Sequence, residues 1–192
     1  TQTPYPLQDA LAREFGLTLE KVRVIVPFVG GGFGGKSVNP QAMDAAKLAK
    51  LSGKTVMLVF TRDEEFFYDA FHSAGVVKIK SGIDRNGMIK LWDYHVYYSG
   101  TRGSETIYDV PNATTTDYSR NKNAPPVHPF ATGPWRAPNN NTNTFAREVQ
   151  IDIMAAAAGI DPLEFRLKNL SDQKMIDCLK AVADKFGYKG AK

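Results

Sequence analysis

The sequence predicts a mixed α+β fold, and three observations support this prediction. The first third of the 192-residue chain alternates short apolar stretches with a helical pattern. The middle alternates apolar and polar residues, which is typical of β-strands, and the last part repeats apolar residues at helical spacing. Hydrophobic residues make up 43% of the chain, which is enough for a packed core. A chain of this length most often forms one domain, and two small domains are the alternative.

The first third predicts a helix, a strand, a glycine loop, a second helix and a second strand. The first helix runs from Thr3 to Gly16 and ends on a residue suited to a C-terminal cap. The β-branched stretch VRVIVPFV at residues 22–29 predicts a buried strand, and TVMLVF at residues 55–60 predicts another. Between them, Asn39 and Pro40 form the expected start of the second helix.

The segment GVVKIKSGIDRNGMIKLWDYHVYY predicts a long antiparallel hairpin. Val77 and Ile79 alternate with lysines, and the dipeptide Asn86-Gly87 is a typical hairpin turn. The apolar face of its second strand should consist of Trp92, Tyr94, Val96 and Tyr98.

The remainder predicts an irregular region followed by helices. Residues 99–143 are rich in Pro, Asn, Thr and Gly, and so long a loop region is often functional. An apolar stripe then indicates a helix that ends at Gly159, and Asp161 caps the next helix. The stripe contains Phe145, Val149 and Ile153, and the inward residues expected of a last helix from about Asp172 are Ile176, Leu179, Val182 and Phe186.

Composition narrows the classes of function. The net charge is +4, but Lys and Arg are mixed with acidic residues, so we expect no nucleic-acid partner. No apolar stretch approaches the roughly 20 residues of a membrane span. The single cysteine, Cys178, excludes an internal disulfide. The chain starts without Met, consistent with a piece of a longer chain, and the compartment stays open between cytoplasm and bacterial periplasm.

The stretch VGGGFGGKSV at residues 29–38 matches the phosphate-loop pattern G-x-x-x-x-G-K-S through residues 30–37. A phosphate loop leads directly into a helix that carries the Lys and Ser on its first turn. Here the helix is expected to start at Pro40, after Lys36 and Ser37. A nucleotide-binding protein is therefore the weaker alternative, and a non-catalytic scaffold domain is a third.

Two segments are candidates for ligand binding. Five glycines surround Phe33, and such a loop lets a ligand approach an open row of backbone N–H groups. In the segment GPWRAP, Arg136 lies between Trp135 and two prolines, so its guanidinium is held ready for an anionic or oxo group. Stacking of Arg136 on Trp135 without a ligand is an equal alternative.

Other polar residues are interpreted as structural. The acidic stretch after Arg62, DEE, is expected to cap or salt-bridge a short turn. The three histidines, His72, His95 and His128, lie on different elements without the clustered spacing that a metal site needs.

Several ordered motifs together resemble one family. TQTP, GGGFGGK, TRDEE, GPWRAP, FAREVQIDIMA and GIDPLEFRLKNL are similar to the molybdenum-binding subunit of the molybdenum hydroxylases. That family includes xanthine dehydrogenases and aldehyde oxidoreductases, and the last two motifs with GPWRAP look most like the isoquinoline 1-oxidoreductase type. The resemblance covers Gln2 to about Leu170, so we expect residues 1–170 to be part of a molybdopterin-binding domain and 171–192 to form a C-terminal helix.

The resemblance implies a set of cofactor contacts. Gln2 matches a glutamine beside an oxygen ligand of the molybdenum, and Phe33 and Gly34 match the backbone pair that faces the same ligands. Arg136 matches an arginine close to the cofactor. With the neighbouring glycines, the expected cofactor-binding residues are Gln2, Gly32, Phe33, Gly34, Gly35 and Arg136. None is expected to ligate the metal, which a pterin dithiolene holds in its plain or its cytosine dinucleotide form.

The resemblance also implies what surrounds this piece. The family hydroxylates an aldehyde or N-heteroaromatic carbon with water-derived oxygen and passes electrons to iron–sulfur or haem partners. Its base is a glutamate beyond the last residue here, so no catalytic residue is expected and the isolated chain should be inactive and free of cofactor. Ser37 and Pro138 replace the acidic and aromatic residues of purine-oxidising relatives, which puts purine recognition in doubt.

Overall fold

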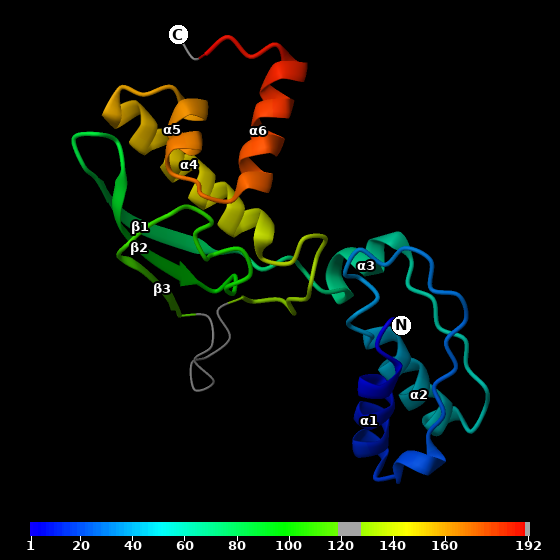
Figure 1. Cartoon of the computed structure of the whole chain (residues 1–192). Coiled ribbons are helices and arrows are strands. Elements are labelled where there is room, and N and C mark those ends of the chain that lie inside the picture. Colours follow the sequence, from blue (N-terminus) through cyan, green and yellow to red (C-terminus); the bar gives the residue numbers. More distant parts are fainter. Residues whose placement is uncertain (119–127, 191–192) are drawn as a thin grey trace. The chain divides into compact units, whose positions relative to one another are not determined.

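The computed structural model describes residues 1–118 and 128–190 and confirms the mixed α+β class. The described chain forms two compact units. The first unit contains Thr1–Ser73 and His128–Pro138, and the second unit contains the described parts of Ala74–Val127 and Asn139–Lys192. Figure 1 shows the elements of each unit.

The first unit is built from helices joined by irregular segments (Figure 1). Helix α1 spans Pro4–Phe15 and ends at Gly16, whose φ of 63° gives the left-handed cap that the sequence predicts. A short 3-10 turn, η1, covers Leu19–Lys21, and α2 covers Pro40–Ser52. Helix α3 covers Arg62–Tyr68.

The prediction of two strands in this unit is wrong. Residues 22–29 and 55–60 are irregular, and no described residue pairs with either segment in a ladder. Ile25 and Met57 are 72% and 90% exposed, and Phe28 is fully exposed. A strand requires a neighbour for its backbone N–H and C=O groups, and β-branched composition cannot supply that neighbour.

The second unit contains the predicted hairpin. Strand β1 spans Val76–Ile83 and pairs antiparallel with β2, Ile89–Tyr97, with Val77 opposite Val96. Gly87 adopts a φ of 74° in the turn, as expected of Asn-Gly. A third strand, β3, spans Ala113–Asp117 and runs parallel to β2, within the region that the sequence analysis assigned to a loop. Its Thr-rich sequence, ATTTD, lacks the apolar alternation that would have revealed it.

Helix α4, Asn140–Ala158, covers one face of this sheet (Figure 1). Trp92, Tyr94 and Val96 of β2 are almost fully buried, as predicted, and pack in one cluster with Ile151 of α4. The cluster extends to α5, Pro162–Lys168. Tyr98 does not share that face, because it lies beyond β2 with a φ of 71° and is 42% exposed.

The apolar stripe of α4 is the exposed side of the helix. Phe145 and Ile153 are 70% and 55% exposed, whereas the buried face includes Asn143 and Arg147. The polar residues are buried because they hydrogen-bond the backbone of the preceding segment, which apolar residues cannot do. In α6, Gln173–Phe186, Ile176 and Leu179 pack against the core as predicted, whereas Val182 and Phe186 are 62% and 82% exposed.

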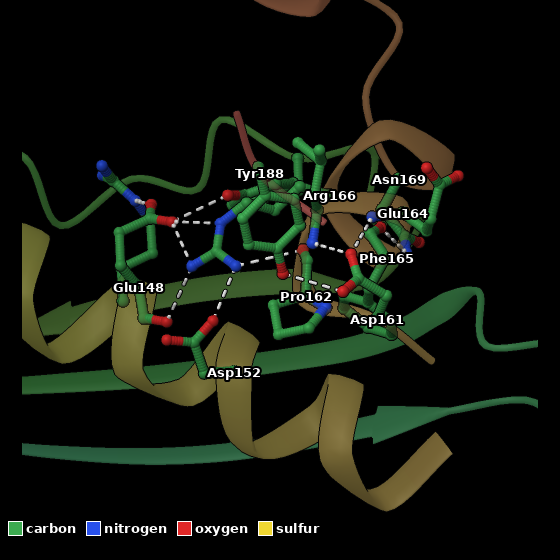
Figure 2. Close-up of polar contacts among 12 residues, drawn as sticks. Glu148, Asp152, Asp161, Pro162, Glu164, Phe165, Arg166, Asn169 and Tyr188 are labelled. Atoms are coloured by element: carbon green, nitrogen blue, oxygen red, sulfur yellow. Dashed lines mark hydrogen bonds and ion pairs between the residues drawn. The ribbon is translucent and has the colours of Figure 1, made fainter. Parts of the chain in front are cut away.

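A polar network fastens α4, α5 and the segment before α4 (Figure 2). The Arg166 guanidinium donates to the carboxylate of Asp152 at 2.6 Å and to that of Glu148 at 3.2 Å. Arg147 donates to Glu148 at 2.9 Å and to the carbonyl oxygen of Gly103. The network therefore holds the irregular segment around Gly103 against α4. No helix of the described chain is long and apolar enough to cross a membrane.

Candidate functional site

The glycine loop after Val29 is a tightly turned segment of the first unit. The amide of Gly35 donates to the carbonyl oxygen of Gly32 at 2.9 Å, and that of Ser37 donates to Gly34 at 3.0 Å. Phe33, which lies inside these turns, has a φ of 50°. A left-handed conformation is uncommon for a bulky residue, and such outliers cluster at functional sites.

The centre of this loop presents unused donors. Among the described residues, the backbone N–H groups of Gly32, Phe33 and Gly34 donate to no acceptor. The Phe33 side chain is 67% exposed, so these amides lie in an accessible segment. Open backbone N–H groups in a glycine-rich turn suit a ligand that carries oxygen acceptors.

The geometry does not support the phosphate-loop alternative. Helix α2 begins at Pro40, so Lys36 and Ser37 precede the helix instead of lying on its first turn. The Lys36 ammonium donates to the carbonyl oxygen of Val29 in its own loop. A phosphate loop needs that ammonium to reach the β- and γ-phosphates, and here it is already engaged.

The N-terminal segment lies against the glycine loop. The backbone N–H of Gln2 donates to the carbonyl oxygen of Lys36 at 2.9 Å. The hydroxyl of Thr3 donates to the backbone carbonyl oxygen of Ser37 at 3.3 Å. The Gln2 amide oxygen is so near that a Cβ at Gly32 would lie 2.8 Å from it. The structure thus brings Gln2 and the loop together, and the glycine at position 32 makes room for the Gln2 side chain.

The segment GPWRAP is positioned by the short stretch after α3. Phe71 donates its amide to Ala131 at 2.8 Å and accepts from the amide of Gly133 at 3.0 Å. The Phe71 and Phe130 rings lie 5.0 Å apart. These contacts hold the loop that carries Arg136 at a fixed place in the first unit.

The two loops meet backbone to backbone. A Cβ at Gly34 would lie 2.0 Å from the carbonyl oxygen of Pro134, so only glycine fits there. Gly34 also has a φ of 108°, which other residues rarely adopt. The Arg136 guanidinium lies 5.4 Å from the centroid of the Phe33 ring. Phe33, rather than the Trp135 weighed in the sequence analysis, is thus the aromatic partner of Arg136.

A cavity of about 460 Å³ opens beside these loops in the first unit. Its volume falls within the roughly 300–1,000 Å³ typical of small-molecule sites. Both signs of charge line it, since Arg62 and Glu65 form an ion pair at 2.5 Å on its rim. The lining residues nearest the loops are Thr1, Gly32, Phe33, Gly35, Lys36 and Trp135.

The acidic stretch of α3 caps its helix, as expected. Thr61 and Glu64 form a reciprocal capping box, in which the Thr61 hydroxyl accepts from the Glu64 amide at 3.3 Å. The Glu64 carboxylate accepts from the Thr61 amide at 2.8 Å, and hydrogen bonds from the Thr61 backbone and side chain lower the pKa of this carboxyl. These acids serve the helix terminus and do not form a catalytic pair.

The described residues contain no group of three or more His, Cys, Asp or Glu side chains that could hold a metal ion. His95 lies on the sheet of the second unit, where its ring contacts Asp93 at 2.9 Å and Tyr118 at 3.2 Å. The site in the first unit consequently offers N–H groups and a guanidinium, which suit a ligand that brings its own metal-binding atoms.

Sequence reasoning missed two features of this site. It treated Lys36 only as a candidate phosphate ligand and did not foresee its bond to Val29. It also did not foresee the contact of Gly34 with Pro134, because these residues are a hundred positions apart. In a run of glycines, the sequence does not show which position requires glycine. Only the folded structure identifies Gly34 as the position where no other residue fits.

Comparison with known proteins covers most of the chain. The model of the molybdopterin cofactor-binding domain matches residues 1–170. The aldehyde oxidoreductase molybdenum-binding subunit PaoC of Escherichia coli K12 is 29% identical over 93% of the chain and 27% of its own length. Isoquinoline 1-oxidoreductase subunit beta of Brevundimonas diminuta is 24% identical over 89% of the chain and 24% of its length.

The fold also matches solved structures. Quinoline 2-oxidoreductase from Pseudomonas putida 86 superimposes with a TM-score of 0.80 at 18% identity, over 97% of this chain and 28% of that chain. The chain therefore spans about a quarter of the length of each of these three proteins. The sequence motifs that resemble the molybdenum hydroxylases lie within the residues 1–170 that the family model matches.

Proposed function

Because this chain belongs to the molybdopterin cofactor-binding domain family, we propose that it forms part of the molybdenum subunit of a hydroxylase and helps to bind the cofactor there. Residues 1–170 would contribute to the cofactor-binding domain, and 171–192, of which 191–192 lie outside the described residues, would add a C-terminal helix. These two relatives are oxidoreductases, and their names indicate an aldehyde and an N-heteroaromatic compound as substrates.

One observation carries the proposal: three neighbouring backbone N–H groups, those of Gly32, Phe33 and Gly34, lack an acceptor within the described chain. Oxygen ligands of a molybdenum centre are acceptors of the kind that these groups need. The Gln2 side-chain amide, whose oxygen lies beside Gly32, and the Arg136 guanidinium approach the same loop, so the NH₂ group of Gln2 and the guanidinium would add donors around one ligand. Gly35 contributes the turn that holds the loop closed.

The role of the chain is to hold and orient the cofactor. The cofactor, when bound, supplies the oxygen transfer and accepts the two electrons released as C–H and water become C–OH and two protons. The backbone N–H groups would fix its orientation by hydrogen bonds that side-chain motion cannot disturb. Arg136 would complement its negative charge.

Other parts of the proposed enzyme lie outside this chain. The base that deprotonates the transferred water would come from another part of the molybdenum subunit, together with the remaining cofactor contacts. Electrons would leave through an iron–sulfur or haem subunit. The preference for an aldehyde or an N-heterocycle, and the plain or cytosine dinucleotide form of the pterin, would depend on those parts.

The Gly34→Ala variant tests this function in the longer subunit. A Cβ there would meet the Pro134 carbonyl at 2.0 Å and force the glycine loop away from GPWRAP. We expect molybdenum and pterin, measured by elemental analysis and fluorescence, to fall at least about tenfold per folded subunit, since one charge-assisted bond is worth about that factor. Gly82→Ala is the control, because its Cβ would make an ordinary 3.6 Å contact in β1. Full cofactor content in Gly34→Ala would reject the proposal.

A further inference from the structure

The glycine loop has little internal bonding at its N-terminal end. Its two backbone hydrogen bonds, from Gly35 and Ser37, both close turns in the C-terminal half. No backbone bond in the described chain holds Gly30 or Gly31. Glycine also has the largest conformational freedom to lose on folding, so this half of the loop needs an external restraint to keep one conformation.

Lys36 is the residue that reaches across this gap. Its ammonium donates to the carbonyl oxygen of Val29, the residue just before the glycines. Its stem lies along Gly32, where a Cβ would come within 3.3 Å of the Lys36 Cβ. Its own carbonyl oxygen accepts the amide of Gln2 at 2.9 Å. The Lys36 side chain thus joins the start and the middle of the loop, and the Lys36 backbone holds the end of the loop to Gln2.

The restraint and the free donors occupy the same few residues. The bond from Lys36 to Val29 closes a ring that encloses Gly32, Phe33 and Gly34, whose N–H groups have no acceptor in the described chain. If the ring opened, the backbone that carries these amides could rotate, and the turns closed by the Gly35 and Ser37 amides would open more often. A charge-assisted hydrogen bond is stronger than a neutral one, so the ammonium suits this task better than a neutral donor.

We propose that Lys36 is a positioning residue: it fastens the two ends of the glycine loop and so presets the row of backbone N–H groups for an oxygen-bearing ligand. This inference rests on the proposed function for the identity of that ligand, but the fastening itself is a property of the ligand-free chain. Lys36 also lines the cavity, and direct contact with the ligand is the competing role that the test must separate.

Amide hydrogen exchange of the 192-residue chain, followed by NMR, tests the fastening. In Lys36→Met, which keeps the apolar stem and removes the ammonium, we expect Gly35 and Ser37 to exchange at least about tenfold faster, the factor that one charge-assisted bond is worth. Lys36→Arg should restore slow exchange. The control is Lys54→Met, which changes an exposed lysine of the same unit and should leave the loop unchanged.

Unchanged exchange in Lys36→Met would overturn the proposal. If that variant does not fold, a measurement on the unchanged chain replaces it: a coupling across the hydrogen bond between Lys36 Nζ and the Val29 carbonyl carbon. Its absence at low temperature, where the ammonium protons exchange slowly, would equally overturn the proposal.

Cofactor content of the longer subunit separates this inference from the proposed function. Fast loop exchange together with lost molybdenum in Lys36→Met supports both. Fast exchange with full molybdenum keeps the fastening and rejects the use of the loop for the cofactor. Slow exchange with lost molybdenum rejects the fastening and indicates that Lys36 contacts the ligand.

Discussion

The guanidinium carbon of Arg136 lies 5.4 Å from the centroid of the Phe33 ring. Two candidate cofactor residues that are far apart in the sequence are thus neighbours in the first unit. A guanidinium over an aromatic face is attracted by the ring, and its edge remains open for hydrogen bonds to another group. The contact therefore orients Arg136 without using its donors.

Replacing Arg136 by Ala in the longer subunit should lower turnover much more than stability. Loss of the contact with the exposed Phe33 ring should reduce the free energy of unfolding by less than about 1 kcal/mol. Loss of a charge-assisted bond to the cofactor, about 1.5–3 kcal/mol, should lower turnover per folded protein roughly ten- to hundredfold. Melting temperature, molybdenum content and rate are to be measured on the same preparation.

Arg136→Lys provides the matched comparison. It keeps the positive charge over Phe33 but lacks the planar fork, so stability should be retained and turnover should recover only in part. A large drop in melting temperature together with normal turnover in Arg136→Ala would assign this arginine to packing alone.

ATP with Mg²⁺ should not bind the chain. Lys36 is engaged with Val29, and helix α2 starts only at Pro40, so Lys36 and Ser37 do not lie on the first turn of the helix that follows the loop. Calorimetric titration should give the same heats as ATP added to buffer, for the unchanged chain and for Lys36→Met alike. Saturable binding that Lys36→Met abolishes would restore the phosphate-loop interpretation.

The local sequence pattern predicted the hairpin correctly, because the alternation of Val77 and Ile79 with lysines requires one buried face and one solvent-exposed face. It failed at residues 22–29, where composition could not show whether a partner strand exists. It identified the apolar stripe of α4 that contains Phe145, but it could not show that buried Arg147 and its carbonyl partners define the inner face of this helix. Tertiary hydrogen bonds decided this face, and sequence spacing does not encode them.

The same limit applies to the candidate site. The glycines and Arg136 could be identified from the sequence because each carries a recognisable motif. The contact of Gly34 with Pro134 and the bond from Lys36 to Val29 could not, since both depend on how the loops fold onto one another. The roles proposed for Gln2 and Phe33 remain predictions for the experiments described above.

Replacing Arg166 by Met should destabilise the second unit by about 2–4 kcal/mol. The change removes the cation that the carboxylates of Glu148 and Asp152 share, and it removes the donor to the carbonyl oxygens of Pro162 and Glu148. Glu148 then keeps its bond to Arg147. Chemical unfolding should be followed by the fluorescence of buried Trp92, in a Trp135→Phe background that removes the other tryptophan.

The control for this prediction is Arg85→Met, which changes an exposed arginine in the hairpin turn. A surface substitution of this kind should alter the free energy of unfolding by no more than about 0.5 kcal/mol. Equal stability of the Arg166 and Arg85 variants would mean that the ion-pair network contributes nothing to the second unit.

The stability of the second unit should fall as the pH rises from 10 to 12. Burial raises the pKa of the Tyr94 phenol from 10.0 to about 12, and the positive charge of Arg147 opposes this only in part. Between these values the unfolded chain has lost the proton that the folded chain keeps, so alkali favours unfolding. Tyr94→Phe should show a shallower loss over this range.

Absorbance at the tyrosinate band checks the same shift directly. The difference between the titrations of the unchanged chain and Tyr94→Phe should report a phenol that ionises near pH 12. Ionisation of Tyr94 near pH 10, or an identical loss of stability in both proteins, would show that water reaches this phenol.

The molybdenum and pterin content of the longer subunit tests the central claim most directly. The subunit that carries this segment should be purified from cells that make the cofactor, and both components should be quantified per polypeptide. We predict close to one molybdenum and one pterin for each subunit. Purification of a folded subunit that contains neither would contradict the assignment of the glycine loop and Arg136 to cofactor binding.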